Sequence, residues 1–115
     1  MNITVQRLSD EVCAAPQLPP EAMAAVAQAG FRSVVNNRPD FEGGPDQPTS
    51  AQMEAAARSA GLEYVFLPVA SNHQTPEQIA EFAALLEHLP KPMLAFCRSG
   101  TRSGKLYAQA MALKG

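Results

Sequence analysis

The sequence predicts a single α/β domain, residues 1–115, with a mostly parallel central sheet flanked by helices. Three observations support this fold class. The chain has 115 residues, a common length for one domain, and 46% of them are hydrophobic. Short apolar segments alternate with segments of helical spacing, and proline or glycine separates most of them. Strands alternating with helices form right-handed crossover units, which build a parallel sheet covered by helices.

The first third of the chain predicts three short strands and one helix. Residues 3–6 alternate apolar and polar side chains, which indicates an edge strand, and a second extended segment is expected at residues 12–14. Pro20 is suited to the first position of a helix and Gly30 to its end. The β-branched segment at residues 33–36 predicts the next strand.

The middle of the chain predicts a long loop, a helix and a strand. Proline and glycine exclude regular structure from residues 37–48. Thr49 and Gln52 have the spacing of a capping box, which opens an alanine-rich helix that stops at Gly61. Residues 64–69 are continuously apolar, as is typical of a strand covered on both faces.

The last third predicts a helix, a buried strand and a final helix. Thr75 and Gln78 repeat the capping-box spacing, and the helix they open ends near His88. Residues 93–96 form a buried strand, and Ser103 begins the last helix. Parallel sheets bind ligands at the carboxyl ends of their strands, so the loops that follow these strands are expected to share one edge.

Composition excludes several classes of function. The formal charge of −2, without a cluster of lysine or arginine, gives no electrostatic basis for binding nucleic acid or an anionic membrane. The sequence has no apolar stretch long enough to cross a bilayer and no signal-peptide pattern at its start, so a cytoplasmic protein is expected. Two cysteines and two histidines offer no paired metal-ligand spacing, and we expect neither a metal nor a cofactor.

A cysteine-led loop after the last strand is the strongest functional signal. It reads Cys97, Arg98, Ser99, Gly100, Thr101, Arg102, Ser103. Gly100 allows successive backbone N–H groups to turn inward, and Arg102 closes this cradle. The Ser103 hydroxyl is expected either to cap the final helix or to hydrogen-bond the sulfur. Amides, arginines and a helix N-terminus all favour the nucleophilic thiolate, so Cys97 is the predicted nucleophile.

The cysteine-led loop resembles the active-site loop of rhodanese-type sulfurtransferases, in which a cysteine carries a persulfide. Cysteine phosphatases place five residues between Cys and Arg, whereas this loop has four, between Cys97 and Arg102. The order of elements and residues 31–40 are similar to the dual-specificity phosphatase fold. Together these features resemble the phosphatase-like domain of beta-lactamase-hydrolase-like proteins, a family regarded as sulfurtransferase-like. The resemblance implies fusion or partnership with persulfide dioxygenase or sulfide:quinone reductase modules.

Residues outside the loop leave alternatives open. A phosphatase needs an acid to protonate the leaving oxygen, and residues 70–73 contain no carboxylic acid; His73 is the one candidate there, although a surface role is the commoner one. Arg38 and Asp40 either border the pocket or form a solvated pair in a turn, and Asp40 is an alternative acid. Gln17 matches a recurrent glutamine of the family. Cys13 is either a resolving thiol or a small buried residue.

The sequence therefore predicts a sulfurtransferase that forms a persulfide on Cys97, with Arg102 as the second catalytic residue. The predicted substrate contacts are Arg98, Ser99, Gly100, Thr101, Ser103, Arg38, Asp40 and His73. The substrate is a small anion, either thiosulfate, a persulfide or a phosphate ester, and a thiol or cyanide accepts the sulfur. Two alternatives remain: a phosphatase that forms a phosphocysteine, and a redox or anion sensor without catalysis.

Overall fold

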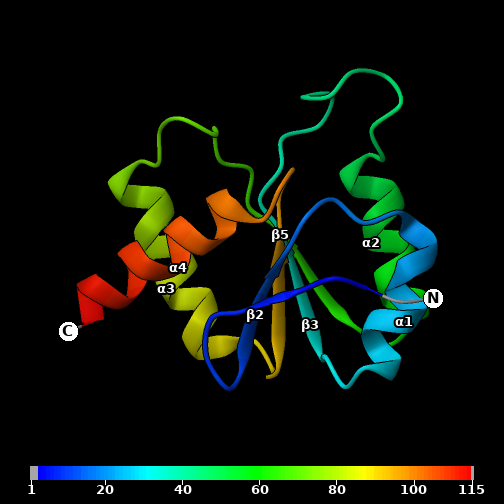
Figure 1. Ribbon diagram of the computed structural model, residues 1–115, viewed down its shortest axis with the longest axis horizontal. Helices are drawn as coiled ribbons and strands as arrows, with labels where there is room; N and C mark the ends of the chain where they lie inside the picture. Colours follow the sequence, from blue (N-terminus) through cyan, green and yellow to red (C-terminus); the bar gives the residue numbers. More distant parts are fainter. Residues whose placement is uncertain (1–2, 115) are drawn as a thin grey trace.

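A five-stranded sheet forms the centre of the computed structural model, which describes residues 3–114 (Figure 1). The strand order is β1-β2-β5-β3-β4. Four strands are parallel, and only the two-residue edge strand β1 is antiparallel. The strands are β1 (Gln6–Arg7), β2 (Val12–Ala15), β3 (Ser33–Asn36), β4 (Glu63–Phe66) and β5 (Met93–Phe96). The molecule therefore has the predicted α/β fold with a mostly parallel sheet.

Helices cover both faces of the sheet. Figure 1 shows α3 and α4 against one face, and α1 and α2 against the other. The helices are α1 (Met23–Gln28), which follows the 3₁₀ turn η1 (Pro20–Ala22), α2 (Ser50–Ser59), α3 (Pro76–His88) and α4 (Thr101–Lys114). Among the described residues, no helix has both the length and the apolar character that crossing a membrane requires.

Strand β5 joins the two halves of the core because its side chains alternate between the faces of the sheet. Leu94 and Phe96 pack in the cluster under α1 and α2. Met93 and Ala95 pack in the cluster under α3 and α4. All four side chains are fully buried, so the strand that leads to Cys97 is fixed on both faces.

The predicted helix starts agree with the structure where they rest on local signals. Thr49 accepts a hydrogen bond from the Gln52 amide and Thr75 accepts one from the Gln78 amide, and each glutamine side chain bonds back to the cap residue. Both predicted capping boxes are therefore confirmed. The last helix differs, because it begins at Thr101, two residues before the expected Ser103.

The prediction that residues 64–69 form a strand covered on both faces is wrong. Strand β4 ends at Phe66, and Phe66 is 37% exposed. The strand lies at the edge of the sheet, where one side has no neighbouring strand. Beyond it, the Leu67 amide donates to the Asn36 carbonyl and the Val69 amide donates to the Asn37 carbonyl, and these bonds guide the chain toward the carboxyl edge.

The long loop of residues 37–48 has internal supports despite its irregular backbone. The Gln47 side chain accepts from the Gly43 amide at 2.7 Å and donates to the Pro39 carbonyl at 2.8 Å. Phe41 adopts a φ of 64°, which is uncommon for a bulky residue, and its side chain is 66% exposed. The chain thus turns sharply beside Glu42, which belongs to the site described next.

Candidate active site

Cys97 is the first residue after β5, and only 1% of it is exposed. Its backbone N–H donates to the Ala15 carbonyl at 3.3 Å, which continues the pairing with β2. The Gly100 N–H donates to the Cys97 sulfur at 3.1 Å. The loop thus directs a backbone N–H at the sulfur and fixes the position of the Cys97 side chain.

Gly100 is the position at which the loop requires glycine. Its φ is 92°, a conformation that other residues adopt with strain. A Cβ at this position would also lie 3.3 Å from the carbonyl carbon of Ala15. The chain that follows β2 is held close to this loop by a hydrogen bond of 3.1 Å from the Gln17 backbone N–H to the Arg98 carbonyl.

Ser103 lies in the first turn of α4 and is fully buried. Its hydroxyl donates to the Asn37 side-chain oxygen at 2.7 Å, and the Asn37 amide group donates to the Leu67 carbonyl at 3.0 Å. The expectation that Ser103 caps α4 or bonds to the sulfur is therefore wrong. It instead ties α4 to the loops that follow β3 and β4.

The Arg102 guanidinium is buried, with 6% of the side chain exposed. Its Nη1 donates to the Val69 carbonyl at 2.9 Å and to the Asn37 carbonyl at 3.4 Å. Both terminal nitrogens also lie 3.1 Å from the Glu42 carboxylate. The side chain is thus held by residues from the loops after β3 and β4.

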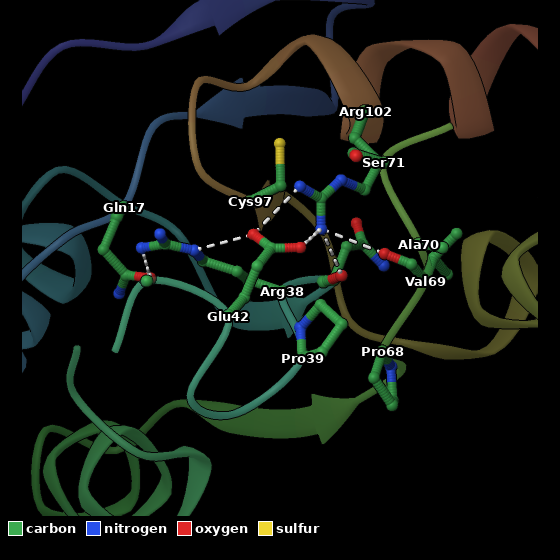
Figure 2. Close-up of polar contacts among 12 residues, drawn as sticks. Gln17, Arg38, Pro39, Glu42, Pro68, Val69, Ala70, Ser71, Cys97 and Arg102 are labelled. Atoms are coloured by element: carbon green, nitrogen blue, oxygen red, sulfur yellow. Dashed lines mark hydrogen bonds and ion pairs between the residues drawn. The ribbon is translucent and has the colours of Figure 1, made fainter. Parts of the chain in front are cut away.

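Glu42 bridges two arginines (Figure 2). Besides Arg102, its carboxylate accepts from Arg38 Nε at 3.0 Å, and Arg38 Nη1 donates to the Gln17 side chain at 3.2 Å. Gly43 makes room for this arrangement, since a Cβ there would lie 2.5 Å from Arg38 Nη2. The four side chains of Gln17, Arg38, Glu42 and Arg102 form one connected network.

The network keeps Glu42 ionised. Burial on its own would raise the pKa of this carboxyl, but hydrogen bonds and positive charge from Arg102 and Arg38 outweigh it, so the pKa lies below its ordinary value. A carboxylate in this state is a poor proton donor at neutral pH.

A cavity of about 780 Å³ opens beside the loop and is lined only by polar side chains and glycine. Four of its residues are among the predicted substrate contacts, Arg38, Arg98, Ser99 and Thr101, and a fifth, Arg102, is the predicted second catalytic residue. Four were missed from the sequence: Glu42, Gly43, Ser71 and Lys105. Lys105 was detectable, because it lies three residues after Arg102 on one helix and therefore near the same face. Glu42 gave no signal, because it lies in an irregular loop.

Four predicted contacts, Gly100, Ser103, Asp40 and His73, are not among the lining residues of this cavity, and neither is the predicted nucleophile Cys97. The Asp40 carboxylate accepts a hydrogen bond of 2.7 Å from the backbone amide of Ser50, and Ser50 is the first residue of α2. His73 is exposed, and its backbone amide pairs with Ala70 in an isolated bridge. Neither side chain is placed where a proton donor to this cavity would stand.

Cys13 lies too far along the sheet to pair with Cys97. It is in register with Leu94, three residues before Cys97 on the adjacent strand. Three residues of strand span about 10 Å, beyond the roughly 7 Å between Cα atoms that a disulfide allows. Burial raises the pKa of the Cys13 thiol, with Arg7 lowering it slightly, so this residue stays a thiol.

Among residues 3–114, no three histidine, cysteine or acidic side chains are grouped so as to hold a metal ion. The groups that the site offers are one cysteine thiol, the backbone amides of its loop and several cationic side chains. Such a site can stabilise an anion and present a nucleophile to it.

The family described as the beta-lactamase hydrolase-like protein, phosphatase-like domain, matches residues 4–114. A beta-lactamase hydrolase-like protein from Agrobacterium fabrum is 37% identical over 91 residues, which cover 79% of this chain and 21% of that protein. A protein of the same name from Xylella fastidiosa is 40% identical over 89 residues, which cover 77% of this chain and 20% of that protein. The chain thus spans about a fifth of the length of these curated relatives.

Two solved structures have a similar fold, and the first of them carries the name phosphatase. A candidate phosphatase from Neisseria meningitidis superposes with a TM-score of 0.85 at 30% identity, covering 95% of this chain and 77% of that one. TpbA from P. aeruginosa, solved as a C132S variant with pTyr, gives a TM-score of 0.65 at 16% identity, covering 92% and 60%. At that identity the second likeness concerns the fold alone, which is that of cysteine phosphatases.

Proposed function

The chain belongs to the phosphatase-like domain family of beta-lactamase hydrolase-like proteins, and from that premise we propose that it is a sulfurtransferase whose nucleophile is Cys97. The thiolate attacks the outer sulfur of an anionic donor and becomes a persulfide. Arg98, Arg102 and the loop amides hold the donor, and a thiol or cyanide then removes the sulfur.

The observation that carries this proposal is that no carboxylic acid suited to donate a proton lines the cavity beside the cysteine-led loop. Glu42 is the only carboxylate among the residues that line the cavity, and Arg102 and Arg38 hold its pKa below the ordinary value. Hydrolysis of a phosphate ester needs a proton on the leaving oxygen, which a general acid usually supplies. Sulfur transfer has no such need, because the leaving group is already a stable anion.

With thiosulfate as donor, the Cys97 thiolate forms a bond to the outer sulfur while the S–S bond of thiosulfate breaks. The electron pair of that bond leaves with sulfite, and the charge on the two sides of the step is equal. The burial of Cys97, at 1% exposed, also supports this reaction, because a single terminal sulfur needs less room than a phosphoryl group. The amide that donates to the sulfur, that of Gly100, is suited to stabilise the resulting persulfide anion.

We expect the reduced protein to gain the mass of one sulfur atom when it is incubated with thiosulfate or glutathione persulfide. Intact-protein mass spectrometry measures the gain, and peptide mapping should place it on Cys97 and leave Cys13 unmodified. Cyanide should remove the sulfur, and Cys97→Ser should prevent loading without unfolding the domain. A folded Cys97→Ser protein that still loads sulfur, or a reduced wild-type protein that never does, would contradict the proposal.

A phosphatase is the second candidate, and the names of the structural neighbours support it more directly than they support the first. In this reaction Cys97 would form a phosphocysteine. The same experiment separates the two candidates if an aryl phosphate is included. Rapid aryl phosphate hydrolysis with a trapped phosphocysteine, and no sulfur adduct, favours the phosphatase. Turnover of neither substrate, together with reversible oxidation of Cys97 by peroxide, favours a sensor.

The wider context remains part of the proposal. The matched segment covers about a fifth of each named relative, so the activity of those whole proteins does not carry over to this chain. Persulfide dioxygenase or sulfide:quinone reductase modules fit as suppliers or consumers of the transferred sulfur, and a small thiol fits as the acceptor. A cytoplasmic location belongs with this context.

A further inference from the structure

Arg102 has more hydrogen-bond donors than its protein partners use. A guanidinium carries five N–H donors in a planar fork. Nη1 donates to the backbone carbonyls of Val69 and Asn37, and it also lies 3.1 Å from a Glu42 oxygen as an ion pair. One hydrogen of Nη2 is directed at Glu42, at 3.1 Å. This leaves the Nε hydrogen and the second hydrogen of Nη2.

These two remaining donors lie on the same edge of the guanidinium, because Nη2 is the terminal nitrogen on the side of the Nε hydrogen. Nε is fully buried and has no hydrogen-bond partner among the described residues. A buried donor without a partner costs free energy, so such a donor indicates a place where a ligand binds. Two parallel N–H groups are suited to bind two oxygens of one anion.

Glu42 occupies the opposite edge of Arg102. Its two oxygens meet Nη1 and Nη2 in a bidentate pair, each at 3.1 Å. An anion can therefore bind at the Nε edge without displacing the carboxylate. In Figure 2, the Cys97 side chain lies on the side of the Arg102 guanidinium away from Glu42.

We propose that Glu42 is a positioning residue that holds Arg102 so that its Nε–Nη2 edge binds the oxyanion part of the substrate. Arg38 fixes Glu42 in turn through its bond of 3.0 Å, and Gln17 fixes Arg38. Two arginines and one carboxylate also leave the cluster with one positive charge for the incoming anion. This inference rests on the proposed function only in requiring an anionic substrate, whether a sulfur donor or a phosphate ester.

The test measures anion binding without turnover. Isothermal titration calorimetry at low ionic strength gives the affinity of the Cys97→Ser protein for thiosulfate and for inorganic phosphate. Adding Glu42→Gln should weaken binding by about tenfold or more, which corresponds to about 1.4 kcal/mol, because the amide cannot hold both arginines. In the protein with Cys97 intact, Glu42→Gln should lower kcat/KM for whichever substrate is turned over.

The matched control is Glu54→Gln, which removes a carboxylate from an exposed pair with Arg58 at the same 3.0 Å distance and i,i+4 spacing as Glu42 and Arg38. It should leave anion affinity unchanged. Thermal melting checks that each variant is folded, and Glu42→Asp, which keeps the charge but reaches less far, should show an intermediate loss. Unchanged or tighter anion binding by Glu42→Gln overturns the proposal, as does the absence of anion binding by the Cys97→Ser protein. Anion binding that depends on Glu42 without sulfur loading would sustain this inference and reject the sulfurtransferase.

Discussion

The residues of the site differ in how far the sequence alone could identify them. Cys97, Arg98 and Arg102 lie within six consecutive residues, so a local motif is enough to identify them. Glu42 is one of eleven acidic residues, and its partner Arg102 lies 60 positions away. Nothing local marks it, since its contacts depend on how two loops meet. The hydrogen-bond partner of Ser103 is equally hidden from local sequence, because the acceptor on Asn37 lies 66 positions away.

At the scale of single residues, we predict that Asp40→Ala lowers stability but not catalysis. The substitution removes the carboxylate that accepts the 2.7 Å hydrogen bond from the Ser50 amide in the first turn of α2. Its loss should lower the free energy of unfolding by about 1 kcal/mol. Urea unfolding measures this loss, and sulfur transfer per folded molecule should stay within about twofold. A drop of a hundredfold or more in activity of the folded variant, as expected for loss of a general acid, would restore Asp40 as a catalytic residue.

Among the helices and strands, features that depend on residues close in sequence were predictable, whereas features that depend on pairing with distant strands were not. Both threonine capping boxes act within one turn of chain, and both are present. Strand β4 has the apolar sequence of a central strand, yet it lies at the sheet edge because β3 pairs with β5 on its other side. Which strand is central is decided by long-range pairing, and hydrophobicity alone does not report it.

The turn between β5 and α4 gives a prediction at this scale. Gly100→Ala should lower the free energy of unfolding by roughly 1–2 kcal/mol, because the residue has a positive φ. It should also abolish sulfur loading, because the new Cβ would press on Ala15 and shift the Gly100 amide that donates to the Cys97 sulfur.

Gly30→Ala is the matched control for that change. Gly30 has a similar φ of 102°, and a Cβ there meets nothing within 4 Å. We expect a comparable loss of stability from Gly30→Ala in urea unfolding, with sulfur loading retained in mass spectra. Equal loading by both folded variants would show that the backbone of the turn does not position the nucleophile.

In the molecule as a whole, the two halves of the core meet at the sheet, and the cysteine-led loop lies over the carboxyl ends of the central strands. The network from Gln17 to Arg102 crosses this edge and joins the loops that follow β2, β3 and β4 to the first turn of α4. Ionisation of Glu42 is therefore coupled to the stability of the entire domain.

The pH dependence of unfolding should reveal this coupling. The pKa of Glu42 is lower in the folded protein than in the unfolded chain, where it is about 4.3, so its ion pairs stabilise the fold above that pH and are lost as the pH falls through the lower folded value. Urea midpoints measured from pH 7 down to about pH 3 should fall more steeply for the wild type than for Glu42→Gln. Glu54→Gln should follow the wild type; parallel curves for wild type and Glu42→Gln would contradict this.

The central position of β5 also has a consequence for how the chain folds. Strand β2 pairs with β5, so residues 12–15 find their parallel partner only at residues 93–96. Such distant contacts slow folding, because the entropy of closing a long loop is lost before the contacts form. During synthesis, β2 stays unpaired on that side until residues 93–96 have been made. Cys97 can enter its buried position only after β5 has paired with β2, so we expect its thiol to be open to oxidation and alkylation in the nascent chain until then.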